Sequence, residues 1–247
     1  MRRAGLNYLI LLICSFYALV FLCDPAMSQV ASPDYSNIRL MLEQGKFQEA
    51  LNLVSRSSDA VSDPVLTYYK AVALAGLEKR SSAIKELTKA ISLDPTKSQF
   101  YLRRGSIFFE TGRPSEAIAD FTAALELAPT APSALGRRAR AFLATGQTSK
   151  ALEDSNSAIR LAPSNAELYK LRADILSTVG DYENALQDYN KAIGLAPNFV
   201  TAINNRAIAL ANLNRPKEAL EDLNSSMELS ISKPSSTSPS VFQGSQW

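Results

Sequence analysis

Carboxylate side chains in the middle of the chain come closest to a catalytic set. Glu116, Asp120, Glu153 and Asp154 could pair for acid and base catalysis, which uses two carboxyl groups. The chain has no histidine, however, and both of its cysteines lie in an apolar N-terminal segment. His-based triads, thiol catalysis and metal sites built from His or Cys therefore lack their residues. No glycine-rich phosphate loop occurs either, so we predict no catalytic residue, no metal site and no cofactor.

Opposite charges recur through the chain at equal intervals, and this recurrence favours a structural role for the carboxylates. Each series falls on the packing stripe of its predicted helix and not on the free face. The basic series is Lys70, Arg104, Arg138, Arg172 and Arg206, and the acidic series is Glu86, Asp120, Asp154, Asp188 and Asp222. We therefore predict partly buried ion pairs between helices, for example Arg138 with Asp154. The alternative is a set of solvated charges kept by duplication of the units.

These charges belong to units of 34 residues. Five alanines follow one another at that interval: Ala83, Ala117, Ala151, Ala185 and Ala219. A fixed period of this length indicates a stacked array of similar units. Within the central unit, apolar or small residues at Tyr101, Gly105 and Phe108 form one helical stripe, and a second stripe contains Ala117 and Phe121. Each unit is therefore predicted to be a pair of helices.

Residues that interrupt a helix recur with the same period. Gly112 and its equivalents Gly146, Gly180 and Asn214 tolerate the left-handed backbone conformation, so they mark the turn inside each unit. A proline ends the second helix of each unit and is followed by an expected N-cap of the next helix. These proline and cap pairs are Pro95 with Thr96, Pro129 with Thr130, Pro163 with Ser164, and Pro197 with Asn198.

The pattern resembles the tetratricopeptide repeat. The small residue of the family's first helix appears as Ala71, Gly105, Ala139, Ala173 and Ala207. Its Ala-x-x-x-aromatic signature is kept from Ala117 to Phe121 and from Ala185 to Tyr189, and it fails at Ser155. The resemblance covers residues 64–230 as five repeats, and a degenerate first repeat is expected in residues 31–63. It implies an all-α fold, a right-handed α-solenoid of helix-turn-helix units.

In this family the first helices line a concave wall, and the resemblance therefore implies which side chains face a partner. Arg103, Arg137 and Arg140 fall on that wall in consecutive units and are predicted to form a basic patch. Aromatic and aliphatic residues are expected beside it, namely Tyr68, Tyr69, Phe109 and Leu143. Such a wall suits an extended segment that mixes acidic and apolar residues. An ordinary solvated groove is the alternative.

A second implied binding site is weaker. Some family members bind chaperone C-termini through a carboxylate clamp of Lys, Asn and Arg side chains. Lys170 and Asn205 match two positions of that clamp in this sequence. Asp174 replaces the first Asn, and no third repeat follows, so the complete clamp is not supported.

The N-terminus carries a predicted targeting segment in residues 1–30. Arg2 and Arg3 precede an uncharged apolar run from Tyr8 to Cys23, and small residues follow at Ala26 and Ser28. This order fits either a cleaved signal peptide or an N-terminal membrane anchor. In both cases the basic end stays inside, so we expect the repeats in an extracytoplasmic compartment, secreted, periplasmic or anchored. A membrane is expected to be contacted only by this segment.

Charge and the C-terminal segment narrow the range of partners. The net charge of +2 is too small to indicate nucleic acid binding, which needs a concentrated basic field. Residues 231–247 are rich in Ser and Pro and are predicted to be a mostly disordered tail. Three apolar residues of this tail, Val241, Phe242 and Trp247, either cover the last repeat or are incidental. If the end stays bare, it can stack on another protomer, which leaves self-association through the solenoid ends open.

These observations predict an exported, non-catalytic scaffold or adaptor that binds a protein or peptide. The alternative is a groove-type peptide receptor with co-chaperone character, which captures one extended acidic and apolar segment. The predicted partner-binding residues are Arg103, Arg137, Arg140, Lys170, Asn205, Tyr69 and Phe109.

Overall fold

The computed structural model describes residues 34–57 and 62–232, and these residues form α-helices and no strand. A short pair of helices comes first, α2 (Tyr35–Glu43) and α3 (Phe47–Arg56). Five longer pairs follow: α4 (Pro64–Gly76) with α5 (Arg80–Leu93), α6 (Ser98–Glu110) with α7 (Pro114–Leu127), α8 (Pro132–Ala144) with α9 (Thr148–Leu161), α10 (Ala166–Thr178) with α11 (Tyr182–Leu195), and α12 (Val200–Asn212) with α13 (Pro216–Ser232).

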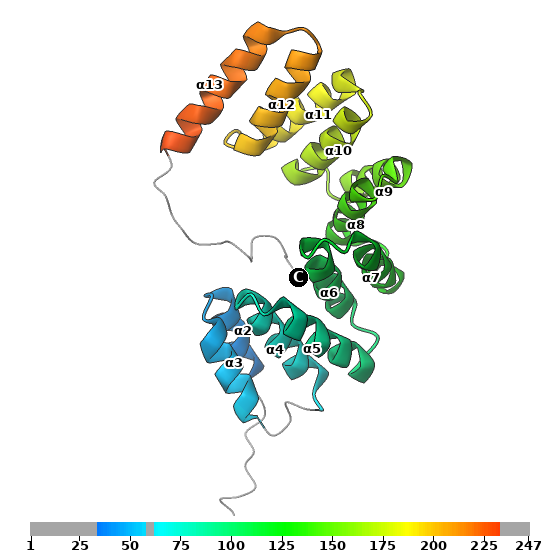
Figure 1. The fold of residues 1–247 in the computed structure, drawn as a ribbon, viewed down its shortest axis with the longest axis vertical. Helices are drawn as coiled ribbons and strands as arrows, with labels where there is room; N and C mark the ends of the chain where they lie inside the picture. Colours follow the sequence, from blue (N-terminus) through cyan, green and yellow to red (C-terminus); the bar gives the residue numbers. More distant parts are fainter. Residues whose placement is uncertain (1–33, 58–61, 233–247) are drawn as a thin grey trace, which may run out of the picture.

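The pairs stack into an open curve with α2 and α3 at one end and α13 at the other (Figure 1). Each first helix packs against its own second helix and against the second helix of the preceding pair. First helices of neighbouring pairs also contact one another, as α6 does with α8 and α8 with α10. Figure 1 accordingly shows α6 and α8 on the inner side of the bend and α7 and α9 on the outer side. The first helices therefore form the concave wall of an all-α solenoid.

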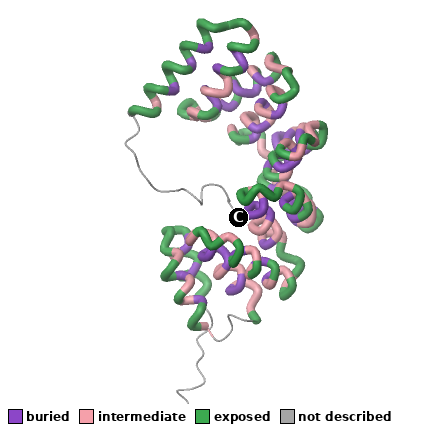
Figure 2. The backbone as a smooth tube through the Cα atoms, viewed as in Figure 1, coloured by how far each residue is buried: buried purple, intermediate pink, exposed green. Residues whose placement is uncertain are grey.

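Buried residues run along the helix pairs from one end of the described chain to the other (Figure 2). Alanines at the repeated positions are fully buried, including Ala83, Ala117, Ala151 and Ala185. Small residues are needed there because two helices approach closely. At Gly105 an added Cβ would lie 2.8 Å from the ring of Phe121, so the large aromatic residue of α7 requires a glycine on α6. The core is thus distributed along the solenoid axis.

The turns inside the pairs adopt the left-handed backbone conformation that the sequence predicted. Gly112, Gly146, Gly180 and Asn214 all have positive φ. Glu78 occupies the same turn in the α4–α5 pair, with φ of 61°, although it is neither Gly nor Asn. Its turn is closed like the others, because the amide of Lys79 donates to the carbonyl of Leu74 at 2.9 Å. Packing of the two helices therefore overrides the local preference of Glu78.

The predicted N-caps were wrong by one residue. The helices begin after Lys97, Ala131, Asn165 and Phe199, and not after the residue that follows each proline. Among these four caps only the side chain of Asn165 accepts a backbone hydrogen bond, from the amide of Glu167. Thr96 is engaged elsewhere, since its hydroxyl donates to Asp94 Oδ1 at 2.6 Å. The residue after the proline thus belongs to the turn that joins two repeats.

The described residues leave the two ends of the chain untested. No helix in residues 34–57 and 62–232 is long and apolar enough to cross a membrane. The predicted signal or anchor in residues 1–30 lies outside the described residues, as do residues 233–247 of the predicted tail. At the C-terminal end α13 extends to Ser232, two residues into that predicted tail.

Candidate functional site

The recurrent charges form ion pairs between the two helices of each repeat. Arg138 on α8 binds Asp154 on α9 through two parallel hydrogen bonds, Nε to Oδ2 at 2.7 Å and Nη2 to Oδ1 at 2.9 Å. The same bidentate pair recurs as Arg104 with Asp120, Arg172 with Asp188, and Arg206 with Asp222. Lys70 and Glu86 form the corresponding pair in α4 and α5, at 2.7 Å. The predicted ion pairs are therefore confirmed, and we call this series the charge ladder.

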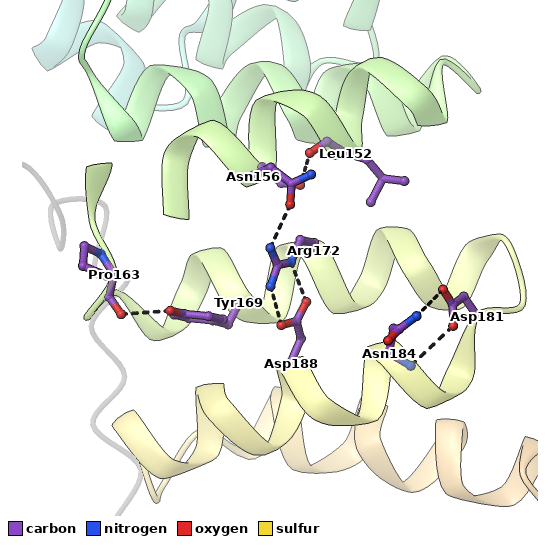
Figure 3. Close-up of polar contacts among 9 residues, drawn as sticks. Leu152, Asn156, Pro163, Tyr169, Arg172, Asp181, Asn184 and Asp188 are labelled. Atoms are coloured by element: carbon purple, nitrogen blue, oxygen red, sulfur yellow. Dashed lines mark hydrogen bonds and ion pairs between the residues drawn. The ribbon is translucent and has the colours of Figure 1, made fainter. Parts of the chain in front are cut away.

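A third residue in the ladder was missed by the sequence analysis. In Figure 3, Arg172 also donates from Nη1 to Asn156 Oδ1 on α9, the second helix of the preceding repeat, at 2.8 Å. The equivalent acceptors are Thr88 for Arg104, Thr122 for Arg138 and Asn190 for Arg206. Each acceptor lies two residues after a ladder acid, and this recurring polar residue is the signal that was available in the sequence. Each ladder arginine thus joins three helices and two repeats.

The ladder arginines are occupied by these internal bonds. Asp120, Asp154, Asp188 and Asp222 are buried, and the hydrogen bonds from the arginines compensate for the loss of water around each carboxylate. Hydrogen bonding to Asp154 raises the pKa of Arg138 above its ordinary value, with burial opposing the shift and the Asp154 charge adding to it. The ladder therefore stabilises the solenoid and has no free cation to offer a ligand.

A second set of arginines lies on the first helices and has few internal partners. Arg137 Nη1 donates to Ser106 Oγ at 2.7 Å, which links α8 to α6, and makes no ion pair with any described residue. Arg140 forms a longer ion pair with Glu167 on α10, 3.2 Å from Nη2 to Oε2, with both side chains about half exposed. Arg103 has no hydrogen bond or ion pair to the described part of the chain, and its buried Nε lacks an acceptor. We call Arg103, Arg137 and Arg140 the arginine patch.

Within the described residues, only Arg140 of the patch has a carboxylate partner, so Arg103 and Arg137 carry positive charge that is not neutralised. Crowding by the concave wall removes water from around the guanidinium group of Arg137 and lowers its pKa, although the side chain is still exposed at the surface. The like charges of Arg103 and Arg140 lower that pKa further, and Glu110 and Tyr68 offset the shift in part. A carboxylate from outside would relieve this repulsion. The patch is therefore suited to bind an anion.

Comparison with known families agrees with the helix pairs. Three family models, each described as tetratricopeptide repeat, match residues 68–132, 108–175 and 166–199, and together they cover residues 68–199. The chain is a tetratricopeptide repeat protein. Curated protein sequences gave no match. Tetratricopeptide repeats typically act as scaffolds for protein interaction, and the repeats of this chain support that broad role.

Solved structures share the fold at low sequence identity. MamA from Desulfovibrio magneticus RS-1 is 20% identical, with a TM-score of 0.64 over 70% of this chain and 97% of that one. The C-terminal part of a repeat protein from Cytophaga hutchinsonii is also 20% identical, with a TM-score of 0.65 over 80% of both chains. YrrB, described as having an unusual peptide-binding site, is 19% identical, with a TM-score of 0.56 over 75% of this chain and 93% of that one. These likenesses establish the fold.

Of the three aromatic residues expected on the concave wall of the tetratricopeptide repeats, only one lies beside the arginine patch. Tyr68 lies near enough to Arg103 and Arg137 for both charges to act on its hydroxyl, and its ring stacks on Phe100 with centroids 5.1 Å apart. Tyr69, predicted to bind the partner, lies near both Tyr68 and Tyr35 of α2, with ring centroids 5.8 Å and 6.5 Å away. Phe109, also predicted, packs partly buried against the core around Phe108 and Phe121. Tyr68 is therefore the aromatic residue that the structure brings to the patch.

The two residues that match the family's carboxylate clamp are engaged by an internal carboxylate. Lys170 Nζ lies 2.7 Å from Asp174 Oδ2, and Asn205 Nδ2 donates to Asp174 Oδ1 at 2.8 Å. The hydroxyl of Tyr189 donates to the same oxygen at 2.8 Å, and its pKa is raised, mainly by burial. Asp174 thus takes the place that a ligand carboxylate would need. Lys170 and Asn205 form a separate internal network and do not extend the arginine patch.

Proposed function

We propose that this protein is an interaction scaffold whose concave wall binds an extended peptide segment through the arginine patch. One observation carries the proposal: Arg103 and Arg137, on consecutive first helices, have no carboxylate partner in the described chain, whereas their sequence neighbours Arg104 and Arg138 are saturated. An unpaired guanidinium group in a crowded wall gains more from a ligand carboxylate than a solvated one does. The ligand is therefore acidic.

The spacing of the two arginines limits the geometry of the ligand. Packed helices lie about 10 Å apart, and a peptide in the extended polyproline II conformation rises about 3.1 Å per residue with three residues per turn, so carboxylates three residues apart can both face the patch. Tyr68 beside the patch offers an apolar ring to a side chain between them. The segment we propose therefore has acidic residues at positions i and i+3 with an apolar residue between. This pattern is a sharper form of the acidic and apolar segment expected from the sequence.

A groove-type peptide receptor with co-chaperone character remains the second candidate function. The arginine patch favours it because a single peptide could satisfy both free arginines. The described peptide-binding site of YrrB supports peptide binding by this fold in general. A receptor would lose its one ligand when the patch is altered. A scaffold would keep other partners that bind at its ends or convex face.

Peptide binding to matched variants tests the proposal. The probe is a fluorescein-labelled peptide with two glutamates three residues apart and a leucine between them. We expect binding to the full chain, and a loss of more than about 2 kcal/mol, the size of an interaction hot spot, when Arg103 and Arg137 are both changed to Gln. Arg160→Gln is the control, since Arg160 is exposed on α9 and donates only to Ser157. Equal binding by the patch and control variants would contradict the proposal.

We also propose that the repeats function outside the cytoplasm. The support is the order of charges before the apolar run at the N-terminus. Fractionation of cells with protease accessibility tests this location. Repeats that stay protected from protease in the cytoplasmic fraction would contradict it.

A further inference from the structure

The last helix of the solenoid carries an uncovered apolar stripe. Leu220, Leu223 and Met227 on α13 are 60%, 44% and 62% exposed. Their spacing of three and four residues places them on one face of the helix. Single exposed apolar residues are common on protein surfaces, but a continuous stripe on one helix marks an interaction surface.

The equivalent positions one repeat earlier are buried or partly buried. Tyr189, 34 residues before Leu223, is 1% exposed, and Leu186 and Ile193, 34 residues before Leu220 and Met227, are partly buried against the core. Tyr189 packs against Ala202 and Ala209 of α12, the first helix of the next repeat. The stripe on α13 is therefore the surface that a following first helix would bury, and no such helix is present in the described residues.

The helices that bury this surface inside the molecule share a pattern. Each has an apolar residue at position i, an arginine at i+4 and an apolar residue at i+7. The sets are Phe100, Arg104 and Ile107 in α6; Ala134, Arg138 and Ala141 in α8; Leu168, Arg172 and Ile175 in α10; and Ala202, Arg206 and Ala209 in α12. The arginine donates from Nη1 to the acceptor on the preceding second helix, as Arg206 does to Asn190 at 2.7 Å.

On α13 the acceptor for such an arginine is present and unused. Asn224 lies two residues after the ladder acid Asp222, the register of Thr88, Thr122, Asn156 and Asn190. Glu221 and Glu228 lie on the same side of the helix, three residues before Asn224 and four after it. Both glutamates are exposed, and neither pairs with a cation in the described residues. Glu221, Asn224 and Glu228 thus form a polar stripe beside the apolar one, and its negative charge is complementary to a helix that carries basic residues.

We propose that this face of α13 binds an amphipathic helix of a partner protein, seated as the first helix of a next repeat. The partner helix carries apolar residues at i and i+7 and an arginine at i+4 that donates to Asn224. The exposed first helix of a second copy, α2, does not have this pattern. Each ladder arginine lies eight residues before the turn glycine or asparagine, and the residue eight before Gly45 is Asn37. Residues 233–247 contain no arginine. A different protein is therefore the occupant.

The probe for this surface is a synthetic helix that already has the pattern. It copies residues 199–213 of α12, with a hydrocarbon staple between positions 204 and 208 so that helix formation does not limit binding. Fluorescence anisotropy with the full chain should show saturable binding. Leu223→Asp should weaken it more than tenfold. Ile208→Asp is the matched control, because Ile208 on α12 is 60% exposed like Leu220, and it should change binding less than twofold.

A double-mutant cycle between Arg206 of the peptide and Asn224 of the protein tests where the peptide helix binds along α13. Arg206→Ala in the peptide should weaken binding about tenfold to the unaltered protein, the size expected for one hydrogen bond to a charged group, and less than twofold to an Asn224→Ala protein. Circular dichroism should show that Leu223→Asp leaves the fold intact, since Leu223 is already exposed.

Four results would overturn the proposal. The first is failure of the stapled peptide to bind, and the second is equal loss of binding in Leu223→Asp and Ile208→Asp. In the third, deletion of residues 234–247 raises affinity tenfold, which would show that the C-terminal segment occupies the face. In the fourth, sedimentation shows a dimer of the full chain that Leu223→Asp dissociates, which would assign the face to a second copy.

Discussion

Arg137 and Arg138 are adjacent in the sequence and have opposite roles in the molecule. Arg138 makes two bonds to Asp154 and one to Thr122, and the bonds to Asp154 raise its pKa. Arg137 has one hydrogen bond, to Ser106, and its pKa is lowered by loss of water and by neighbouring arginines. Successive residues of an α-helix point about 100° apart, so one side chain enters the interface with α7 and α9 while the other lies on the concave wall. The comparison shows that helix face, and not residue type, separates structural from binding arginines.

Arg103 and Arg104 repeat this division one unit earlier. Arg104 binds Asp120 and Thr88, and Arg103 has no partner in the described chain. In the next two units the residue before the ladder arginine is Leu171 or Asn205, so no further free arginine continues the pair. The arginine patch is therefore confined to the two central repeats.

Removal of a ladder carboxylate should give the largest loss of stability. Asp154→Ala leaves Arg138 charged, partly buried and without its main partner, so we expect the free energy of unfolding in urea to fall by about 3 to 5 kcal/mol. The adjacent Glu153→Ala is the control and should change it by less than about 0.5 kcal/mol, because Glu153 is exposed. In a double-mutant cycle with Arg138→Ala the effects should be strongly non-additive. Additive effects would mean that the pair is not coupled.

Loss of the third ladder residue should have an intermediate effect. Asn156→Ala removes the acceptor of Arg172 Nη1 and should destabilise the protein by about 1.5 kcal/mol, as expected for a hydrogen bond to a charged group. Asn156→Thr should recover most of that loss, because Thr122 serves as the acceptor in the neighbouring repeat. If threonine is no better than alanine in urea unfolding, the interrepeat bond does not contribute.

The smallest effect on stability is expected in the arginine patch. Arg137→Gln removes a cation that is repelled by Arg103 and Arg140, so the free energy of unfolding should rise or stay within about 0.5 kcal/mol. The gain should be larger at low salt than at high salt, since salt screens the repulsion. Urea unfolding at the two salt concentrations measures it. A loss above about 1 kcal/mol would show that Arg137 is structural, like Arg138.

The repeated helix pairs, the position of most of their turns and the charge ladder could be predicted from the sequence. The reason is that these features are periodic: one mispredicted unit is corrected by its neighbours, and residues on one helix stripe must face the same interface. The pair of Arg138 with Asp154 follows from this periodicity. The turn at Glu78 and the shifted N-caps could not be predicted from the sequence, because packing between helices outweighs the local preference of single residues at these positions.

Packing between helices determines which candidate binding residues are free of internal partners. Lys170 and Asn205 matched a binding pattern, yet Asp174 engages both, and its bond to Asn205 joins residues 31 apart in the sequence. Tyr68 reaches the arginine patch while Tyr69 turns toward α2, although both were candidates. A side chain's partners depend on distances between different helices, and these distances are not periodic in the sequence. The repeat pattern therefore predicts where charged residues occur, and packing determines which of them are free to bind a ligand.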